Sequence, residues 1–150
     1  MDFCGKMNSI KPKPKVLFLC SGNTSRSQMA EALLRKLGGE RFDAYSAGLE
    51  PSAVNPFTIQ VLEEIGVDMS AQRSKSLLEY MGKVHFGYLI TVCNRADRKC
   101  PIFPGMGVRL HWPFDDPAAA NGSDDEKLAI FRQVRDQIKT KVLEWLKTMS

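Results

Sequence analysis

The chain has 150 residues, a length that fits one domain, and 43% of them are hydrophobic, as in an ordinary globular core. The net charge of +4 is mild, and the one basic run, at Lys11, Lys13 and Lys15, is typical of a solvated tail rather than a nucleic-acid surface. No segment resembles a signal peptide or reaches the roughly 20 apolar residues of a membrane span, so we expect a cytoplasmic monomer that binds neither nucleic acid nor membrane.

The first residues of the chain do not have the pattern of a folded core. Residues 1–14, with Pro12 and Pro14, predict a flexible N-terminal extension, and residues 15–150 predict one α/β domain. Cys4 lies in the extension, where we expect it to have no role. Four cysteines in a chain of a reducing compartment indicate thiol chemistry rather than a disulfide framework.

The first elements of the domain frame a loop. Residues 16–19 are typical of a short buried strand and residues 29–37 of a helix, so the loop from Cys20 to Ser27 joins a strand to a helix N-terminus. Loops of this kind bind phosphate-like anions through inward-pointing N–H groups, and Arg26 is placed to grip two oxygens of such an anion. The same field favours a thiolate at Cys20, which is then able to attack the bound anion.

The alternative is a buried strand cysteine next to a surface arginine. That interpretation requires the strand, the turn-forming Gly22 and Asn23, and the Arg–Ser pair to coincide by chance. We expect Ser27 to cap the helix, and the hydroxyl of Ser27 or Ser25 to donate a hydrogen bond to the Cys20 sulfur.

Further along the chain, strands alternate with helices. We expect strands at residues 42–46, 88–92 and 108–112, a helix capped by Asn55–Pro56 that runs to Gly66, and a short helix at residues 74–81. The last helix starts at a capping box, Ser123 to Glu126, and its apolar positions recur at spacings of three and four: Leu128, Phe131, Val134, Ile138, Val142, Trp145 and Met149. The alternation predicts a four-stranded parallel sheet with helices on both faces.

In such a sheet, ligands bind at the carboxyl ends of the strands, where Cys20, Cys93 and the loop after Trp112 converge. Cys93 ends its strand, and Cys100 follows seven positions later. The pair has three interpretations: a zinc site, for which the spacing is poor; two unrelated thiols; or a relay for thiol–disulfide exchange, favoured by the basic residues between them. Asp115 and Asp116 before Pro117 form either a turn or a general acid.

Several segments resemble one family. The loop is similar to the Cys-x5-Arg-Ser loop shared by low-molecular-weight protein tyrosine phosphatases and thioredoxin-coupled arsenate reductases. The cysteine pair with Pro101, and the segments at residues 46–48, 66–70 and 111–117, resemble the reductases. The resemblance therefore covers nearly the whole chain after residue 14 and implies the fold of the low-molecular-weight tyrosine phosphatases.

The resemblance implies an arsenate reductase. Arsenate, with phosphate and sulfate as competing anions, would be held by Arg26 and the loop residues Ser21, Gly22, Asn23, Thr24, Ser25 and Ser27. Cys20 would attack arsenic, Asp116 would protonate the departing oxygen, and Cys93 and Cys100 would carry the oxidation to thioredoxin, with glutaredoxin as the other possible donor. A rigid helix at residues 94–99 would keep the last two sulfurs apart, so we expect that segment to rearrange on oxidation.

The family pattern is not followed everywhere. Ser25 replaces a further cysteine of many reductases, and Gln28 stands where the phosphatases usually have proline. Asn23, Glu31 and Ser46 match three potassium ligands of some members, but the fourth position falls near Lys75. The ammonium group of Lys75 can stand in for the metal ion, so we expect at most a weak potassium site and little or no stimulation by potassium. We expect no tightly bound cofactor.

Two other functions remain open. A phosphatase would use Cys20, Arg26 and Asp116 alone, but Ala118, Ala119 and Ala120 follow the acid where phosphatases carry aromatic residues. A noncatalytic oxyanion-binding redox sensor would bind and oxidise without turnover. We expect His85 and His111 to be packing or surface residues.

Overall fold

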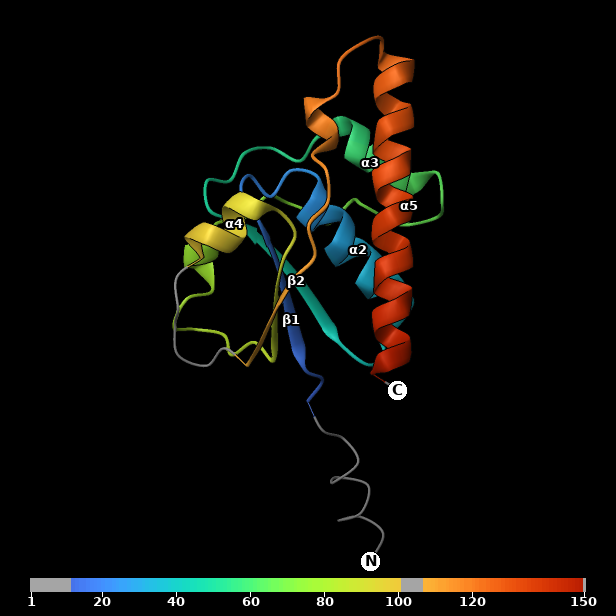
Figure 1. Cartoon of the computed structure of the whole chain (residues 1–150). Helices are drawn as coiled ribbons and strands as arrows, with labels where there is room; N and C mark the ends of the chain where they lie inside the picture. The colour runs from blue at the N-terminus through green and yellow to red at the C-terminus, as the bar shows by residue number, and fades with distance from the viewer. Residues whose placement is uncertain (1–11, 101–106, 150) are drawn as a thin grey trace, which may run out of the picture.

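The computed structural model describes residues 12–100 and 107–149 (Figure 1). Their order is β1 (Lys15–Cys20), α2 (Arg26–Gly38), β2 (Asp43–Gly48), α3 (Pro56–Glu63), a 3₁₀ turn (Leu77–Glu79), β3 (Tyr88–Thr91), α4 (Asn94–Lys99), β4 (Val108–His111), a second 3₁₀ turn (Pro117–Ala119) and α5 (Asp124–Thr148). The expected extension and Cys4 fall mostly or wholly outside the described residues. No helix within the described ranges is long and apolar enough to cross a membrane.

The sheet is parallel and has the strand order β2-β1-β3-β4. β1 is the innermost by burial, with five of its six residues buried, because both of its faces are covered. α2 and α5 lie on one side of β1 and β2 in Figure 1, and α4 lies on the other. The predicted α/β fold with helices on both faces is confirmed.

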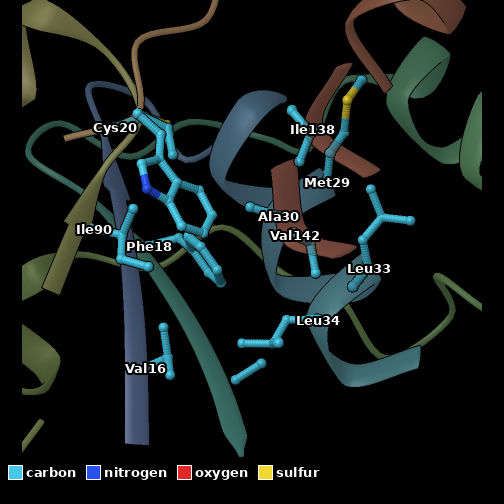
Figure 2. Packing of buried hydrophobic residues seen from close by; sticks show 14 of the residues in the cluster. Val16, Phe18, Cys20, Met29, Ala30, Leu33, Leu34, Ile90, Ile138 and Val142 are labelled. Atoms are coloured by element: carbon cyan, nitrogen blue, oxygen red, sulfur yellow. The ribbon is translucent and has the colours of Figure 1, made fainter. Parts of the chain in front are cut away.

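One core holds the sheet to α2 and α5. Figure 2 shows Val16 and Phe18 of β1 together with Leu33 of α2 and Ile138 and Val142 of α5 in this layer, and all five are buried. α5 begins at the predicted capping box, in which the Ser123 and Glu126 side chains bond each other's backbone N–H groups. The long helix is therefore placed by its cap and by its apolar stripe.

The structure differs from the sequence-based expectations at four helix positions. α2 begins at Arg26, three residues earlier than predicted, and α3 ends at Glu63, before the turn that closes at Gly66. The helix expected at residues 74–81 is only a 3₁₀ turn, which Ser76 and Glu79 close with a capping box of their own. α4 is a helix of six residues that the sequence did not predict as one.

The attachment of α5 gives a testable prediction. Ile138 is fully buried on the inner face of α5, and replacing it with alanine should cost about 2–5 kcal/mol of unfolding free energy through lost contacts and a residual cavity. Ile130 on the same helix is 37% exposed, so Ile130→Ala should cost much less. Urea unfolding of both variants checks this, and equal losses would mean that α5 is not anchored through its inner face.

Candidate active site

The peptide groups of the loop after β1 are held in one orientation. The carbonyls of Cys20, Ser21, Gly22 and Thr24 accept hydrogen bonds from backbone N–H groups of residues 49–55, and Ser25 begins the ladder of α2. Because these carbonyls are bound by an outer segment, the N–H groups of the loop are left to face the opposite way. A row of inward N–H groups at the start of a 13-residue helix is a site for an anion.

Gly48 lets the outer segment come close enough to do this. A Cβ atom at Gly48 would lie 2.8 Å from both the Asn23 nitrogen and the Ser21 oxygen. No ordinary side chain fits there, so the last residue of β2 must be glycine for the loop to keep its path. Asn23 itself takes a left-handed φ of 53°, which asparagine tolerates better than most residues.

The Cys20 sulfur receives two polar contacts. Its Sγ lies 2.8 Å from the Ser27 Oγ and accepts a hydrogen bond from the Asn23 backbone N–H at 3.2 Å. Asn23 Nδ2 donates to the same Ser27 Oγ at 2.7 Å, which occupies an acceptor position of that oxygen and leaves its proton for the sulfur. Both contacts therefore direct hydrogen-bond donors at the sulfur of the expected nucleophile.

Ser27 is therefore not a helix cap, contrary to the expectation from the sequence. It lies inside the first turn of α2, and the cap position falls at Ser25, whose side chain makes no capping hydrogen bond. The Ser25 Oγ is buried and has no hydrogen-bond partner within the described residues. Of the two serines proposed as donors to Cys20, the structure selects Ser27.

Arg26 and Asp116 meet across a cavity at the carboxyl ends of the strands. Arg26 donates to the Phe114 carbonyl at 3.1 Å, and its Nη2 lies 3.8 Å from the Asp116 Oδ2. The other carboxyl oxygen of Asp116 accepts the Ala118 N–H, which fixes the side chain. The cavity has a volume of about 350 Å³ and is lined by Ser21, Arg26, Cys93, Asn94, Arg95, Pro113, Phe114, Asp115 and Asp116.

Cys93 lies beside the Cys20 loop. Its buried Sγ is 3.6 Å from the Ser21 Oγ and also accepts the Ala96 N–H at the start of α4. Arg95 of α4 forms an ion pair with Glu50, a residue of the segment that ties the loop carbonyls. The Cys20 loop, Cys93 and the loop after Trp112 therefore lie together, as the sheet topology predicted.

Cys100 occupies the far end of α4. It is buried, and burial raises the pKa of its thiol, with Asp97 acting in the same direction and Arg109 against it. In this state Cys100 is a weaker nucleophile at neutral pH than an exposed thiol. Among the described residues no cluster of three or more His, Cys, Asp or Glu could hold a metal ion, which gives the zinc interpretation of the pair no support.

A buried lysine occupies the position where the sequence suggested a weak potassium site. The Lys75 Nζ lies 2.6 Å from the Arg73 carbonyl, 3.3 Å from the Ser46 Oγ and 3.4 Å from the Glu31 Oε1. Burial lowers the pKa of Lys75, while Glu31 opposes that shift and favours the ammonium form. Because these oxygens already surround an ammonium group, the residues present do not fit a resident potassium ion.

The same lysine reaches the loop through its backbone. The Lys75 N–H donates to the Asn23 Oδ1 at 2.8 Å. Asn23 thus connects the Cys20 sulfur, the Ser27 hydroxyl and the Lys75 segment, and it is completely buried. The expected grouping of Asn23, Glu31, Ser46 and Lys75 is found, with the lysine at its centre.

Gln28 is a site residue whose role the sequence did not reveal. Its Nε2 lies within hydrogen-bond distance of the Asn23 carbonyl, the Asn23 Oδ1 and the Arg73 carbonyl, and its Oε1 accepts from Gln72. The only signal in the sequence was a polar side chain where the phosphatases usually have proline.

Two other residues lie where the sequence placed them. His85 is exposed, and Trp112 is in the core as expected.

Comparisons with known proteins agree with this geometry. The profile of the low molecular weight phosphotyrosine protein phosphatase family matches residues 15–150. The arsenate reductase of Halalkalibacterium halodurans is 43% identical over 137 residues, which are 91% of this chain and 97% of that protein. A solved arsenate reductase in its phosphate-binding state has a TM-score of 0.76 at 32% identity and covers 91% of this chain and 99% of its own.

A third relative depends on thioredoxin. The thioredoxin-dependent arsenate reductase of Corynebacterium glutamicum has a TM-score of 0.69 at 27% identity, and the match covers 95% of this chain and 65% of that one.

The Lys75 cluster gives a prediction about potassium. The melting temperature of the wild-type protein should be the same in sodium and potassium chloride at equal ionic strength, because the ammonium group fills the site. Lys75→Met should lose about 2 kcal/mol of unfolding free energy, less than the roughly 3–5 kcal/mol for breaking a buried pair, since Arg35 still contacts Glu31. Potassium should restore part of this loss in the variant; an equal response of wild type and variant would contradict the assignment.

Proposed function

The chain belongs to the low molecular weight phosphotyrosine protein phosphatase family, and within it we propose that this protein is a thioredoxin-dependent arsenate reductase. One observation carries the proposal: a second thiol, Cys93, lies in the wall of the cavity that contains Arg26 and Asp116, in contact with Ser21 of the Cys20 loop. An oxyanion site with a nucleophile suits hydrolysis or reduction. A second thiol within reach of the first adduct suits reduction.

The first step is an attack on arsenic. Arsenate is held by the loop N–H groups and by Arg26, and the Cys20 thiolate forms a bond to arsenic. The hydroxyl group of monoprotonated arsenate departs and takes a second proton from Asp116, so that it leaves as water. The contacts that support this step are the two donors on the Cys20 sulfur and the position of Asp116 beside Arg26.

The second step transfers electrons. The Cys93 thiolate attacks the Cys20 sulfur, a disulfide forms, and the electron pair of the broken sulfur–arsenic bond remains on arsenic, which leaves as arsenite. The Cys100 thiolate then attacks Cys93 and releases Cys20 as a thiolate. Thioredoxin reduces the resulting Cys93–Cys100 disulfide, and the cycle needs no bound cofactor. These exchanges require the reducing conditions of the cytoplasm, which is where we place the protein.

The two other functions fit the site less well. A phosphatase has no use for Cys93 in the cavity wall, and the residues that follow Asp116 offer alanines rather than an aromatic wall, although Phe114, two residues before Asp116, lines the cavity. A sensor without turnover has no use for a general acid next to Arg26.

The decisive experiment measures arsenate-dependent oxidation of NADPH in the presence of thioredoxin and thioredoxin reductase. Wild-type protein should turn over, and Cys20→Ser and Cys93→Ser should yield no arsenite. Cys100→Ser should yield about one arsenite per molecule in the absence of an added thiol and then stop, with Cys20 and Cys93 joined in a disulfide.

Other outcomes identify the other functions. Hydrolysis of an aryl phosphate that survives in Cys93→Ser and Cys100→Ser, without arsenate reduction by the wild type, would indicate a phosphatase. Reversible oxidation of the wild type without any NADPH consumption would indicate a sensor. Replacement of thioredoxin by glutaredoxin and glutathione in the same assay tests the electron donor.

The role of Asp116 gives a separate prediction. Asp116→Asn keeps the shape of the side chain but removes its proton, and the rate of the first step should fall about 10²- to 10⁴-fold, as for loss of a general acid. Asp115 also lines the cavity and offers a matched control, since Asp115→Asn should change the rate little. The measurement is arsenite release in a single turnover, and a larger loss in Asp115→Asn would transfer the role to that residue.

A further inference from the structure

The middle of α4 is fastened to the sheet through the side chain of Asp97. Asp97, in the middle of the helix, accepts a hydrogen bond from the Thr91 hydroxyl at 3.1 Å. Arg109 of β4 donates to the Asp97 Oδ1 at 3.2 Å and also to its backbone carbonyl. Burial of the Asp97 carboxyl acts to raise its pKa, but these two donors and the nearby His111 lower it overall, which keeps the carboxylate charged.

A second fastening holds the first turn of α4. His111 Nε2 is 3.0 Å from the Asn94 Oδ1, and its Nδ1 is 2.8 Å from the Thr91 Oγ1. Thr91 is fully buried, so its hydroxyl depends on these protein partners rather than on water. Two side chains of β4 and one of β3 therefore hold a short helix that buries only Ala96 of its own residues.

The helix keeps apart two cysteines that the proposed relay must join. Cys93 and Cys100 flank α4 on its two ends, seven residues apart. At a rise of about 1.5 Å per residue, seven helical positions span roughly 10 Å, whereas a disulfide needs Cα atoms within about 7 Å. The Cys93–Cys100 disulfide cannot form while α4 is wound.

We propose that Thr91, Asp97, Arg109 and His111 form a latch that stabilises the dithiol state of Cys93 and Cys100 and opens when these two cysteines join. The proposal rests on the relay of the proposed function. The four are positioning residues, since they act on the thiols through the path of the chain. Unwinding of α4 moves Asp97, which is in its centre, away from Thr91 and Arg109, so the latch and the disulfide exclude each other.

The latch has a thermodynamic consequence. An interaction present only in the dithiol state opposes oxidation, so its removal must favour the disulfide. When Cys100 and Cys93 lose two electrons and two protons to an external disulfide, the equilibrium constant for that exchange should rise as the latch is weakened. The reduction potential of the pair should become more negative by the same free energy.

The experiment isolates the pair in a Cys4→Ser, Cys20→Ser background and measures its potential against mixtures of reduced and oxidised dithiothreitol. Thr91→Val removes the central hydroxyl while keeping the branched shape, and it leaves all charges near Cys100 unchanged. We expect the equilibrium constant to rise about three- to tenfold, a shift of roughly 15 to 30 mV at about 30 mV per tenfold for a two-electron couple. Arg109→Met, at the surface, should shift it in the same direction.

Thr58 provides the matched control. It is fully buried in α3, and its hydroxyl has no hydrogen-bond partner among the described residues, so Thr58→Val makes the same chemical change outside the latch. Its potential should equal that of the parent. Hydrogen exchange of the α4 amides in the reduced protein should be faster in Thr91→Val and unchanged in Thr58→Val, which separates a latch from a general loss of stability.

The experiment distinguishes failure of the proposed relay from failure of the proposed latch. If Cys93 and Cys100 form no disulfide with each other in this background, the relay itself is wrong. If they form one, but Thr91→Val and Arg109→Met leave both its potential and the exchange of α4 unchanged, the relay stands and the latch is overturned.

Discussion

The chemistry of the site depends on the direction in which the peptide groups of residues 20–25 point. A backbone loop offers N–H groups to an anion only if its carbonyls are satisfied elsewhere, because a buried carbonyl without a partner is costly. Here the outer segment at residues 49–55 supplies those partners. That segment can approach because Gly48, the last residue of β2, has no side chain. The N–H groups of the loop after β1 are therefore free to face an anion.

The second requirement is a stable centre for the polar groups behind the loop. Asn23 serves the Cys20 sulfur and Ser27 on one side and is held by Gln28 and the Lys75 backbone on the other. A buried network of this kind is rigid only when every member is satisfied. The ammonium group of Lys75 completes this network from within the chain through its contacts with Glu31 and Ser46.

Local patterns predicted the elements that local physics determines. The strand before Cys20 and the capping box at Ser123 were readable because apolar runs, caps and apolar spacing act within a few residues. α4 was not, since its six residues lack an apolar stripe and contacts from β3 and β4 hold it. The expected cap role of Ser27 was wrong, whereas its expected contact with the Cys20 sulfur is found. A serine at a helix start can be a cap or a sulfur donor, and only the three-dimensional path of the loop decides between them.

α4 also determines the order in which Cys93 and Cys100 react in the proposed relay. A helix of six residues is marginal by itself, so its contacts to the sheet account for much of its stability, and few interactions have to break for it to unwind. While it is wound, Cys93 lies against the Cys20 loop and Cys100 is buried at the other end with its pKa raised. In the proposed relay Cys93 must therefore react first, because Cys100 gains access and nucleophilic strength only after the helix opens. The order of the two exchanges follows from the fold of the segment between the cysteines, which sets both the position and the burial of each thiol.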